Sequence, residues 1–152
     1  MRYAAFLLVL ITLYGCVKDE FCIEPNAVLM TVDFKTYDST RLVDTPLLDA
    51  TVYNTENALF FADGLLQLRT VDIALDRTAV QQTYIIYHSM TQDTIQVSYT
   101  TEEVFISNGC GYQTYFELQN VSHSKQNIDS VNIIKSQVDN TAQNPHLEVI
   151  YK

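Results

Sequence analysis

The sequence of 152 residues contains no tryptophan, few glycines and prolines, and few basic side chains. Nine lysines and arginines stand against 18 aspartates and glutamates, which gives a formal net charge of −9 at pH 7. This balance argues against nucleic acid as a partner and against electrostatic adsorption to anionic lipid, because both depend on clustered positive charge. The absence of tryptophan also counts slightly against a sugar-binding surface.

Motifs that carry catalysis or metal binding are also missing. The sequence has neither a glycine-rich phosphate loop nor a Gly-X-Ser-X-Gly nucleophile motif. Its three histidines, His88, His123 and His146, are far apart, so no two of them have the spacing of metal ligands. The sequence therefore indicates no catalytic residue, no metal ligand and no cofactor.

Two weaker site hypotheses remain open. Asp38, Asp44 and Asp49 lie close together in sequence, but they lack the Asp-X-Asp-X-Asp-Gly pattern of a calcium loop. Tyrosines are plentiful, and a set of them could form a platform for a sugar or a protein. The alternative is a purely structural role, in which most of them are half-buried strand residues. The tyrosines in question are Tyr53, Tyr84, Tyr87, Tyr99, Tyr112 and Tyr115.

Hydrophobic residues alternate with polar ones in many short segments, which is typical of β-strands. In residues 28–37, Val28, Met30, Val32 and Phe34 share one face, so this segment reads as a half-buried strand. No segment keeps a helical period over ten residues, and no repeat or interdomain linker is visible. Similar strand patterns occur at 48–52, 71–75, 80–89, 93–100, 103–107 and 112–121, and in two segments near the C-terminus.

These patterns predict an all-β fold made of roughly eight or nine short strands. We expect an antiparallel two-sheet sandwich, with a small β-barrel as the alternative. Turns are predicted at residues 38–40 and at the Asn108-Gly109-Cys110-Gly111 corner. Asp63-Gly64 stands between two apolar runs, which is the strongest short-range signal for a hairpin turn.

The N-terminus has the features of a secretory signal. Arg2 precedes an apolar run that covers residues 4–13, and charged residues follow soon after. As a helix this run would span only about 16 Å, whereas the hydrocarbon core of a bilayer is about 30 Å thick. A buried strand or helix of the mature fold is also disfavoured, because the run has neither a strand nor a helix period.

The segment Leu13-Tyr14-Gly15-Cys16 resembles a bacterial lipobox, although a smaller residue is usual at the position of Tyr14. The resemblance implies cleavage before Cys16 and acylation of its thiol, so that a lipid bilayer is a partner of the chain. The predicted organisation is a signal peptide at 1–15, a lipidated cysteine with a short tether at 16–24, and one β domain at 25–152.

The two remaining cysteines, Cys22 and Cys110, are expected to form a disulfide. Export implies an oxidising compartment, in which two leftover thiols usually pair, and two free thiols are the alternative. The bond would close a loop of roughly 89 residues, for which the chain-entropy model gives about 4–5 kcal/mol as an upper figure. Without a disulfide, one of these cysteines with a nearby histidine would be a candidate nucleophile.

The lipobox, the second cysteine and the segment "EVFISNGCGYQTYF" together resemble a family of Bacteroidota lipoproteins of unknown function. The shared features are Cys110-Gly111-Tyr112 and a following strand with Phe116. The resemblance implies a compact β domain and adds no activity. We expect the lipid anchor to hold this domain at the outer membrane.

The residues after the lipobox cysteine also carry a short pattern. Cys16, Lys18, Asp19 and Glu20 match a cysteine-X-lysine-acid-acid pattern. This pattern resembles the export signal that sends some lipoproteins of that phylum to the cell surface. We therefore expect surface display, with a periplasm-facing location as the alternative. The leading functional hypothesis is a non-enzymatic module that binds an envelope protein or glycan, or that helps to assemble a larger surface complex. The alternative is an envelope hydrolase that acts on polysaccharide or peptide.

Overall fold

A computed structural model describes residues 22, 27–56, 59–65, 67–139 and 145–152. Within these residues the chain is all-β and contains no helix, as the sequence predicts. The strands are β1 (Leu29–Asp38), β2 (Arg41–Asp44), β3 (Ala50–Asn54), β4 (Phe60–Leu65), β5 (Thr70–Ala74), β6 (Gln81–His88), β7 (Thr91–Ser107), β8 (Gly111–His123), β9 (Ile128–Ile133), β10 (Gln137–Val138) and β11 (Leu147–Tyr151). The described residues thus contain eleven strands, where the sequence predicts eight or nine.

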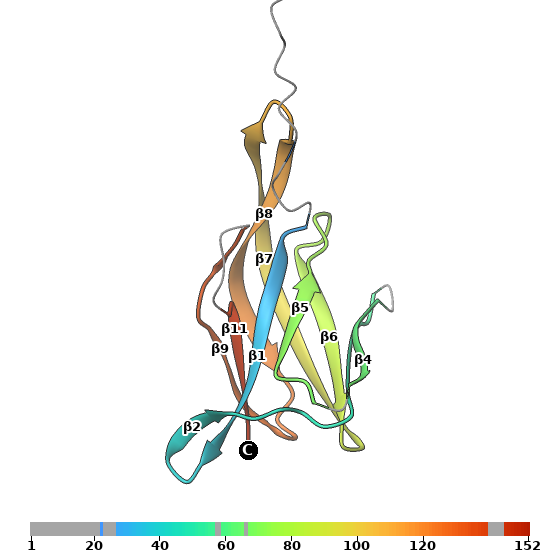
Figure 1. Cartoon of the computed structure of the whole chain (residues 1–152), viewed down its shortest axis with the longest axis vertical. Helices are drawn as coiled ribbons and strands as arrows, with labels where there is room; N and C mark the ends of the chain where they lie inside the picture. Colours follow the sequence, from blue (N-terminus) through green and yellow to red (C-terminus); the bar gives the residue numbers. More distant parts are fainter. Residues whose placement is uncertain (1–21, 23–26, 57–58, 66, 140–144) are drawn as a thin grey trace, which may run out of the picture.

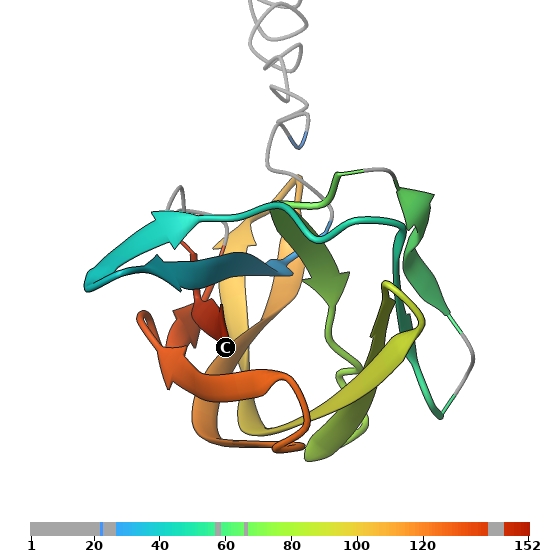
Figure 2. The same cartoon turned by 90° about the horizontal axis from the view of Figure 1, so that it is seen from below.

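The strands form two sheets that face each other, consistent with a β-sandwich (Figures 1 and 2). The first sheet has the order β2-β1-β11-β9, and β5 pairs with the first half of β1 on the same edge as β2. The second sheet has the order β10-β8-β7-β6-β3-β4 and curls around the core. The predicted sandwich is therefore confirmed as an architecture.

The expectation that all strands pair in antiparallel fashion is wrong for one pair of strands. β1 pairs in parallel with β11, from Val32 opposite Leu147 to Thr36 opposite Tyr151. A parallel pair needs a long connection, and here nearly the whole domain forms it. Alternation within a strand shows which face is buried but not which strand lies alongside, so the sequence pattern does not reveal this pairing.

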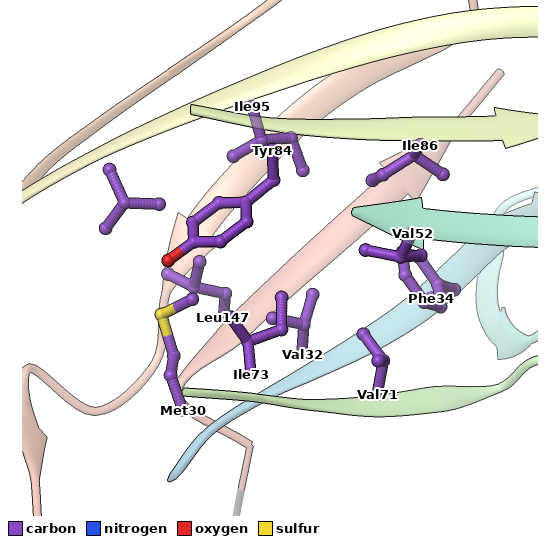
Figure 3. A pocket seen from close by; sticks show the side chains of 11 residues that line it. Met30, Val32, Phe34, Val52, Val71, Ile73, Tyr84, Ile86, Ile95 and Leu147 are labelled. Carbon is purple, nitrogen blue, oxygen red and sulfur yellow. The ribbon is translucent and has the colours of Figure 1, made fainter. Parts of the chain in front are cut away.

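The core lies between the two sheets and consists of the inward faces predicted by alternation. Val28, Met30, Val32 and Phe34 are buried as expected. The facing sheet contributes Val52, Tyr84, Ile86, Ile95, Val97, Tyr99, Phe116 and Leu118. Figure 3 shows side chains from both sheets around an internal cavity of about 10 Å³, which is too small for a ligand.

The predicted hairpin turn at Asp63-Gly64 is wrong. Both residues lie inside strand β4, which pairs with β3. Ala50 lies opposite Leu65 and Val52 opposite Ala62, so β4 has one residue more than β3 over this stretch. This extra residue is a β-bulge, and Gly64 supplies the positive φ of 58° that it requires. The Asp-Gly pair suits a bulge as well as a turn.

The alternation expected to begin at Leu48 also fails at its first residue. Ala50 and Val52 are buried, but the side chain of Leu48 is 51 % exposed. Asp49, between Leu48 and Ala50, has a φ of 49°. This positive φ interrupts the extended backbone and turns the Leu48 side chain outward. Strand β3 accordingly begins only at Ala50.

Strands β7 and β8 extend beyond the rest of the described fold. They pair from Ile95 opposite His123 to Ser107 opposite Gly111, whereas β6 accompanies β7 only as far as Ser98. Residues 102–115, which include the connecting turn, therefore form a two-stranded projection that we call the arm (Figure 1). Five residue steps from Glu102 to Ser107 give the arm a length of about 17 Å. The C-terminus lies at the opposite end of the molecule, which we call the distal end.

Candidate functional site: arm tip and distal cleft

The tip of the arm carries a disulfide. Cys110 lies in the turn before β8, and its sulfur is bonded to Cys22, with 4.7 Å between the two Cα atoms. The backbone N–H of Cys110 donates a hydrogen bond to Ser107 Oγ at 3.1 Å. Gly111 follows with a φ of 71°, a conformation that a residue with a Cβ rarely adopts. The glycine thus allows the corner at which the second cysteine is presented.

Next to the disulfide, the arm carries a cross-strand aromatic pair. Phe105 lies opposite Tyr112, and their ring centroids are 5.4 Å apart in an edge-on arrangement. The two side chains are 53 % and 70 % exposed, respectively. Below them, Thr114 donates a hydrogen bond to Glu103 across the strands. The arm is therefore uncharged toward its tip, with an exposed aromatic pair, and acidic toward its base.

An open cleft of about 440 Å³ lies at the base of the arm. It is bounded by Val28, by Asp76 and Arg77, and by Glu103 and Tyr112 of the arm. Asp76 already has hydrogen-bond partners in its own turn. Its Oδ1 accepts hydrogen bonds from the side chain and from the backbone of Thr78, both at 2.7 Å. These bonds lower the pKa of the Asp76 carboxyl. Its carboxylate therefore holds the turn before β6.

A second cleft, of about 260 Å³, lies at the distal end, and we call it the distal cleft. Its lining includes Lys35, Leu48, His88, Tyr151 and Lys152. The Lys35 amine lies 2.7 Å from Glu148 Oε2, and the hydrogen bond between them is the main reason that the pKa of Lys35 is raised. Lys152 Nζ donates hydrogen bonds to two backbone carbonyls of the β8–β9 loop.

Beside the distal cleft, strands β6 and β7 are joined by a strained two-residue turn. His88 pairs with Thr91, and the turn residues Ser89 and Met90 have φ values of 47° and 63°. A turn of this shape is usually formed by Asn-Gly, because residues with larger side chains adopt positive φ at a cost. Met90 is 89 % exposed at the apex. The turn thus projects an apolar side chain from the distal end.

A buried carboxylate lies behind the distal cleft. Asp93, which is fully buried, accepts a hydrogen bond from Ser124 Oγ at 2.7 Å and one from Asn127 Nδ2 at 3.0 Å. Asn127 adds a backbone N–H at 3.3 Å. Burial alone would raise the pKa of Asp93, but these donors together lower it. The ionised carboxylate therefore fastens the start of β7 to the loop between β8 and β9.

His88 lies between this carboxylate and the cleft. Its Nε2 is 3.9 Å from Asp93 Oδ2, and its ring packs edge-on against Tyr151 with centroids 4.8 Å apart. Neither His88 Nε2 nor the Tyr151 hydroxyl, both buried, has a hydrogen-bond partner among the described residues. Burial lowers the pKa of His88, although Asp93 acts in the opposite direction. The ring is therefore a neutral group at pH 7.

The other two histidines lie elsewhere. His146 is fully buried, and its Nδ1 accepts a hydrogen bond from the backbone N–H of Thr31 at 2.9 Å. His123, at the end of β8, contacts the carbonyl of Ser124 through Nδ1 at 2.7 Å. Within the part of the chain that the structure describes, no three His, Cys, Asp or Glu side chains gather as a metal site would require.

The six tyrosines do not form one platform. Tyr84 and Tyr99 are buried, and their hydroxyls donate to Gln82 Oε1 at 2.8 and 3.0 Å. Burial raises the pKa of both phenols, that of Tyr99 to about 12. Tyr87 and Tyr112 are exposed on different parts of the second sheet. The alternative interpretation, that these are ordinary strand residues, holds for the buried pair.

The predicted site residues of the N-terminus are only partly covered. Cys16, Lys18, Asp19 and Glu20 lie outside the described residues. Cys22 is described, and the disulfide expected between it and Cys110 is present. Among the described residues, no helix is long and apolar enough to cross a bilayer. Sequence reasoning missed the Phe105–Tyr112 pair and the Asp93 cluster, because neither has a signature in local sequence.

The fold and its two ends define a small, disulfide-linked all-β domain with a projecting arm. A family model matches residues 48–151, and its description is a family of unknown function, DUF6452. The match covers more than half of the chain, so the protein belongs to this family. It includes the arm and every strand from β3 to β11. No curated protein and no solved structure matches the chain.

Proposed function

We propose that the protein is a lipid-anchored envelope protein that binds a protein or glycan partner through its distal end and catalyses no reaction. The observation that carries this proposal is the position of the disulfide. Cys22, six residues after the lipobox cysteine Cys16, is bonded to the tip of the arm, and the distal cleft lies at the other end of the molecule. An anchor at one end leaves the other end free for a partner.

The anchor is supported by the sequence before Cys22. An apolar run with one preceding arginine ends in a lipobox-like segment, and Lys18, Asp19 and Glu20 follow Cys16 in the pattern of a surface-export signal. Membership of a family of unknown function agrees with the resemblance to uncharacterised Bacteroidota lipoproteins. We propose that the protein lies at the outer membrane and faces the cell exterior, with the periplasmic face as the alternative.

The binding role is supported by the form of the distal end. The distal cleft is large enough for one side chain or one sugar unit and combines two amines with Leu48 and Tyr151. The exposed Met90 stands beside it on a strained turn. Exposed loops on a rigid scaffold are common places for recognition.

The alternative of a hydrolase rests on the Asp93 cluster, and its geometry is unfavourable. Asp93 lies between Ser124 and His88, so the serine hydroxyl donates to the carboxylate. An activated nucleophile needs its proton directed to a base that can take it at neutral pH. A carboxylate with a lowered pKa is a poor base for this purpose.

Acylation is tested by labelling cells with a clickable fatty acid. The wild-type protein should incorporate the label, and Cys16→Ala should lose it. Cys22→Ala is the matched control, since it removes a nearby cysteine and should retain the label. Incorporation that is unchanged in Cys16→Ala would refute the anchor.

The binding end is tested by photo-crosslinking in intact cells. A photoreactive amino acid at Met90 reports on the distal end, whereas one at Val80 is a matched control. Val80 is also highly exposed, but it lies near the base of the arm, where its carbonyl accepts a hydrogen bond from Tyr99. The proposal predicts a discrete cross-linked product from Met90 and none from Val80. Cross-linked products from Val80 alone would show that the partner binds near the base of the arm, and would refute the proposed distal binding site.

A further inference from the structure

We propose that the tip of the arm rests in the interfacial layer of the bilayer that holds Cys16, with Phe105 and Tyr112 inserted among the lipid head groups. This inference rests on the proposed lipid anchor and adds a second, non-covalent contact to it. It concerns only the outer part of the arm, from residue 104 to residue 113.

The aromatic pair has the properties of an interfacial contact. Phe105 and Tyr112 lie opposite each other on neighbouring strands and are more than half exposed. Tyrosine is enriched at membrane interfaces, because its ring is apolar while its hydroxyl stays hydrated. The two ring centroids are 5.4 Å apart, so the side chains pack against each other and form one apolar surface close to the turn.

The distribution of charge along the arm sets how deep the tip can go. Residues 104–113 contain no charged side chain, although the whole chain has a net charge of −9. Glu102 and Glu103 come directly before this stretch, and burying their carboxylates in lipid would be costly. The uncharged tip can therefore enter the interface, and the acidic base of the arm must stay in water.

The disulfide holds this tip close to the anchor. Cys16 is six residues from Cys22, a stretch that spans at most about 21 Å when fully extended. Tyr112 follows Cys110 by two residues, or about 7 Å along the strand. An acyl chain in the bilayer thus keeps the aromatic pair near the head groups. This tether is why the bilayer, and not a separate protein, is the occupant that we propose for the tip.

The chain contains no tryptophan, so a single introduced tryptophan reports on its own position. Tyr112→Trp places the probe at the arm tip, and Tyr37→Trp is the control, because Tyr37 is also about half exposed but lies at the end of β1. The full lipidated protein is reconstituted into phosphatidylcholine vesicles whose acyl chains are brominated, and flotation establishes that it is bound. Bromine quenches tryptophan only at close range.

The proposal predicts that brominated lipid quenches most of the fluorescence of the Tyr112→Trp protein and shifts its emission to shorter wavelength. The Tyr37→Trp protein should show neither effect. Adding Cys22→Ser and Cys110→Ser to the Tyr112→Trp protein should reduce the quenching, provided that circular dichroism shows a folded domain.

Three outcomes would overturn the proposal. Protein that floats with the vesicles but shows no quenching at position 112 overturns the arm-tip contact and leaves the anchor intact. A probe at position 112 that is shielded from aqueous iodide but unquenched by brominated lipid shows that protein covers the tip. Wild-type protein that does not float overturns the lipid anchor and, with it, this inference.

Discussion

Cys22 and Cys110 are 88 residues apart in sequence, yet their Cα atoms lie 4.7 Å apart at the tip of the arm. This bond joins the start of the domain to the point of the fold that projects farthest from its core (Figure 1). Any segment that precedes Cys22 is therefore attached at the arm and not at the body of the sandwich. In the anchored state that we propose, an arm about 17 Å long would hold the body away from the anchor point.

Removal of the disulfide should destabilise the domain. Cys22→Ser and Cys110→Ser should each lower the free energy of unfolding by about 2–5 kcal/mol, because the unfolded chain regains the freedom of a long loop. The double variant should cost little more than either single variant, since both remove the same bond. Thermal unfolding measures these differences. Two unequal and additive effects would mean that the thiols act independently.

Replacement of Asp93 should also destabilise the domain. Asp93→Ala removes a fully buried acceptor and leaves the donors of Ser124 and Asn127, which are only partly accessible to water, without it. We expect a loss of about 2–4 kcal/mol in chemical denaturation. Asp129→Ala, at an exposed position on β9, is the matched control and should stay within about 0.5 kcal/mol of wild type. Equal losses for both variants would show that the Asp93 contacts are energetically unimportant.

Stability should fall as the pH is lowered below about 6.5, the usual pKa of histidine in an unfolded chain. Burial is the main reason that the pKa values of His88 and His146 are lowered in the folded protein. In this range the unfolded chain binds protons that the folded chain does not, so acid favours unfolding until the folded pKa values are reached. At pH values about one unit or more above 6.5, both rings are neutral in the folded and the unfolded chain, and their contribution to stability is complete.

The contribution of His146 to this pH dependence can be isolated. In His146→Asn the amide oxygen can take the place of Nδ1 as acceptor for the Thr31 N–H, but the side chain no longer titrates. The free energy of unfolding, measured at several pH values between about 7.5 and 5.5, should therefore fall less steeply than in the wild type. Identical slopes would contradict a neutral, buried His146.

The proposal that the protein catalyses no reaction leads to a prediction about the histidines. A panel of hydrolytic assays on polysaccharide and peptide substrates should reveal no turnover that depends on His88, His123 or His146. The physical reason is that His146 is fully buried, the His88 ring packs against Tyr151, and Asp93 accepts the hydrogen bond of the Ser124 hydroxyl. Turnover that disappears in His88→Gln, in a variant that remains folded, would establish the hydrolase alternative.

Strand alternation in the sequence predicted the buried face of β1 and the inward side chains of β7, and the cysteine count predicted the disulfide. These signals are local, or depend only on composition, and are therefore visible without a structure. The parallel pairing of β1 with β11 depends on contacts between the two ends of the domain. The sequence around Gly64 predicts a hairpin turn where the structure has a bulge, because both require a residue with positive φ.

The candidate sites were less accessible to prediction than the fold. The Asp93 cluster collects donors from residues more than 30 positions away, and the distal cleft combines β1, β6 and the C-terminus. The Phe105–Tyr112 pair becomes visible only when the register of β7 and β8 is known. Even the length of the arm depends on where β6 and β10 stop pairing, which no residue pattern shows.

The anchor and the disulfide can be tested together by the intact mass of the mature protein, extracted from membranes in detergent without reduction. Our account predicts a chain that begins at Cys16, carries the mass of diacylglycerol or more, and accepts no alkylating reagent until it is reduced. After reduction it should accept two alkyl groups, at Cys22 and Cys110. A mature chain that retains residues 1–15, lacks lipid, or is alkylated at both cysteines before reduction would contradict the account.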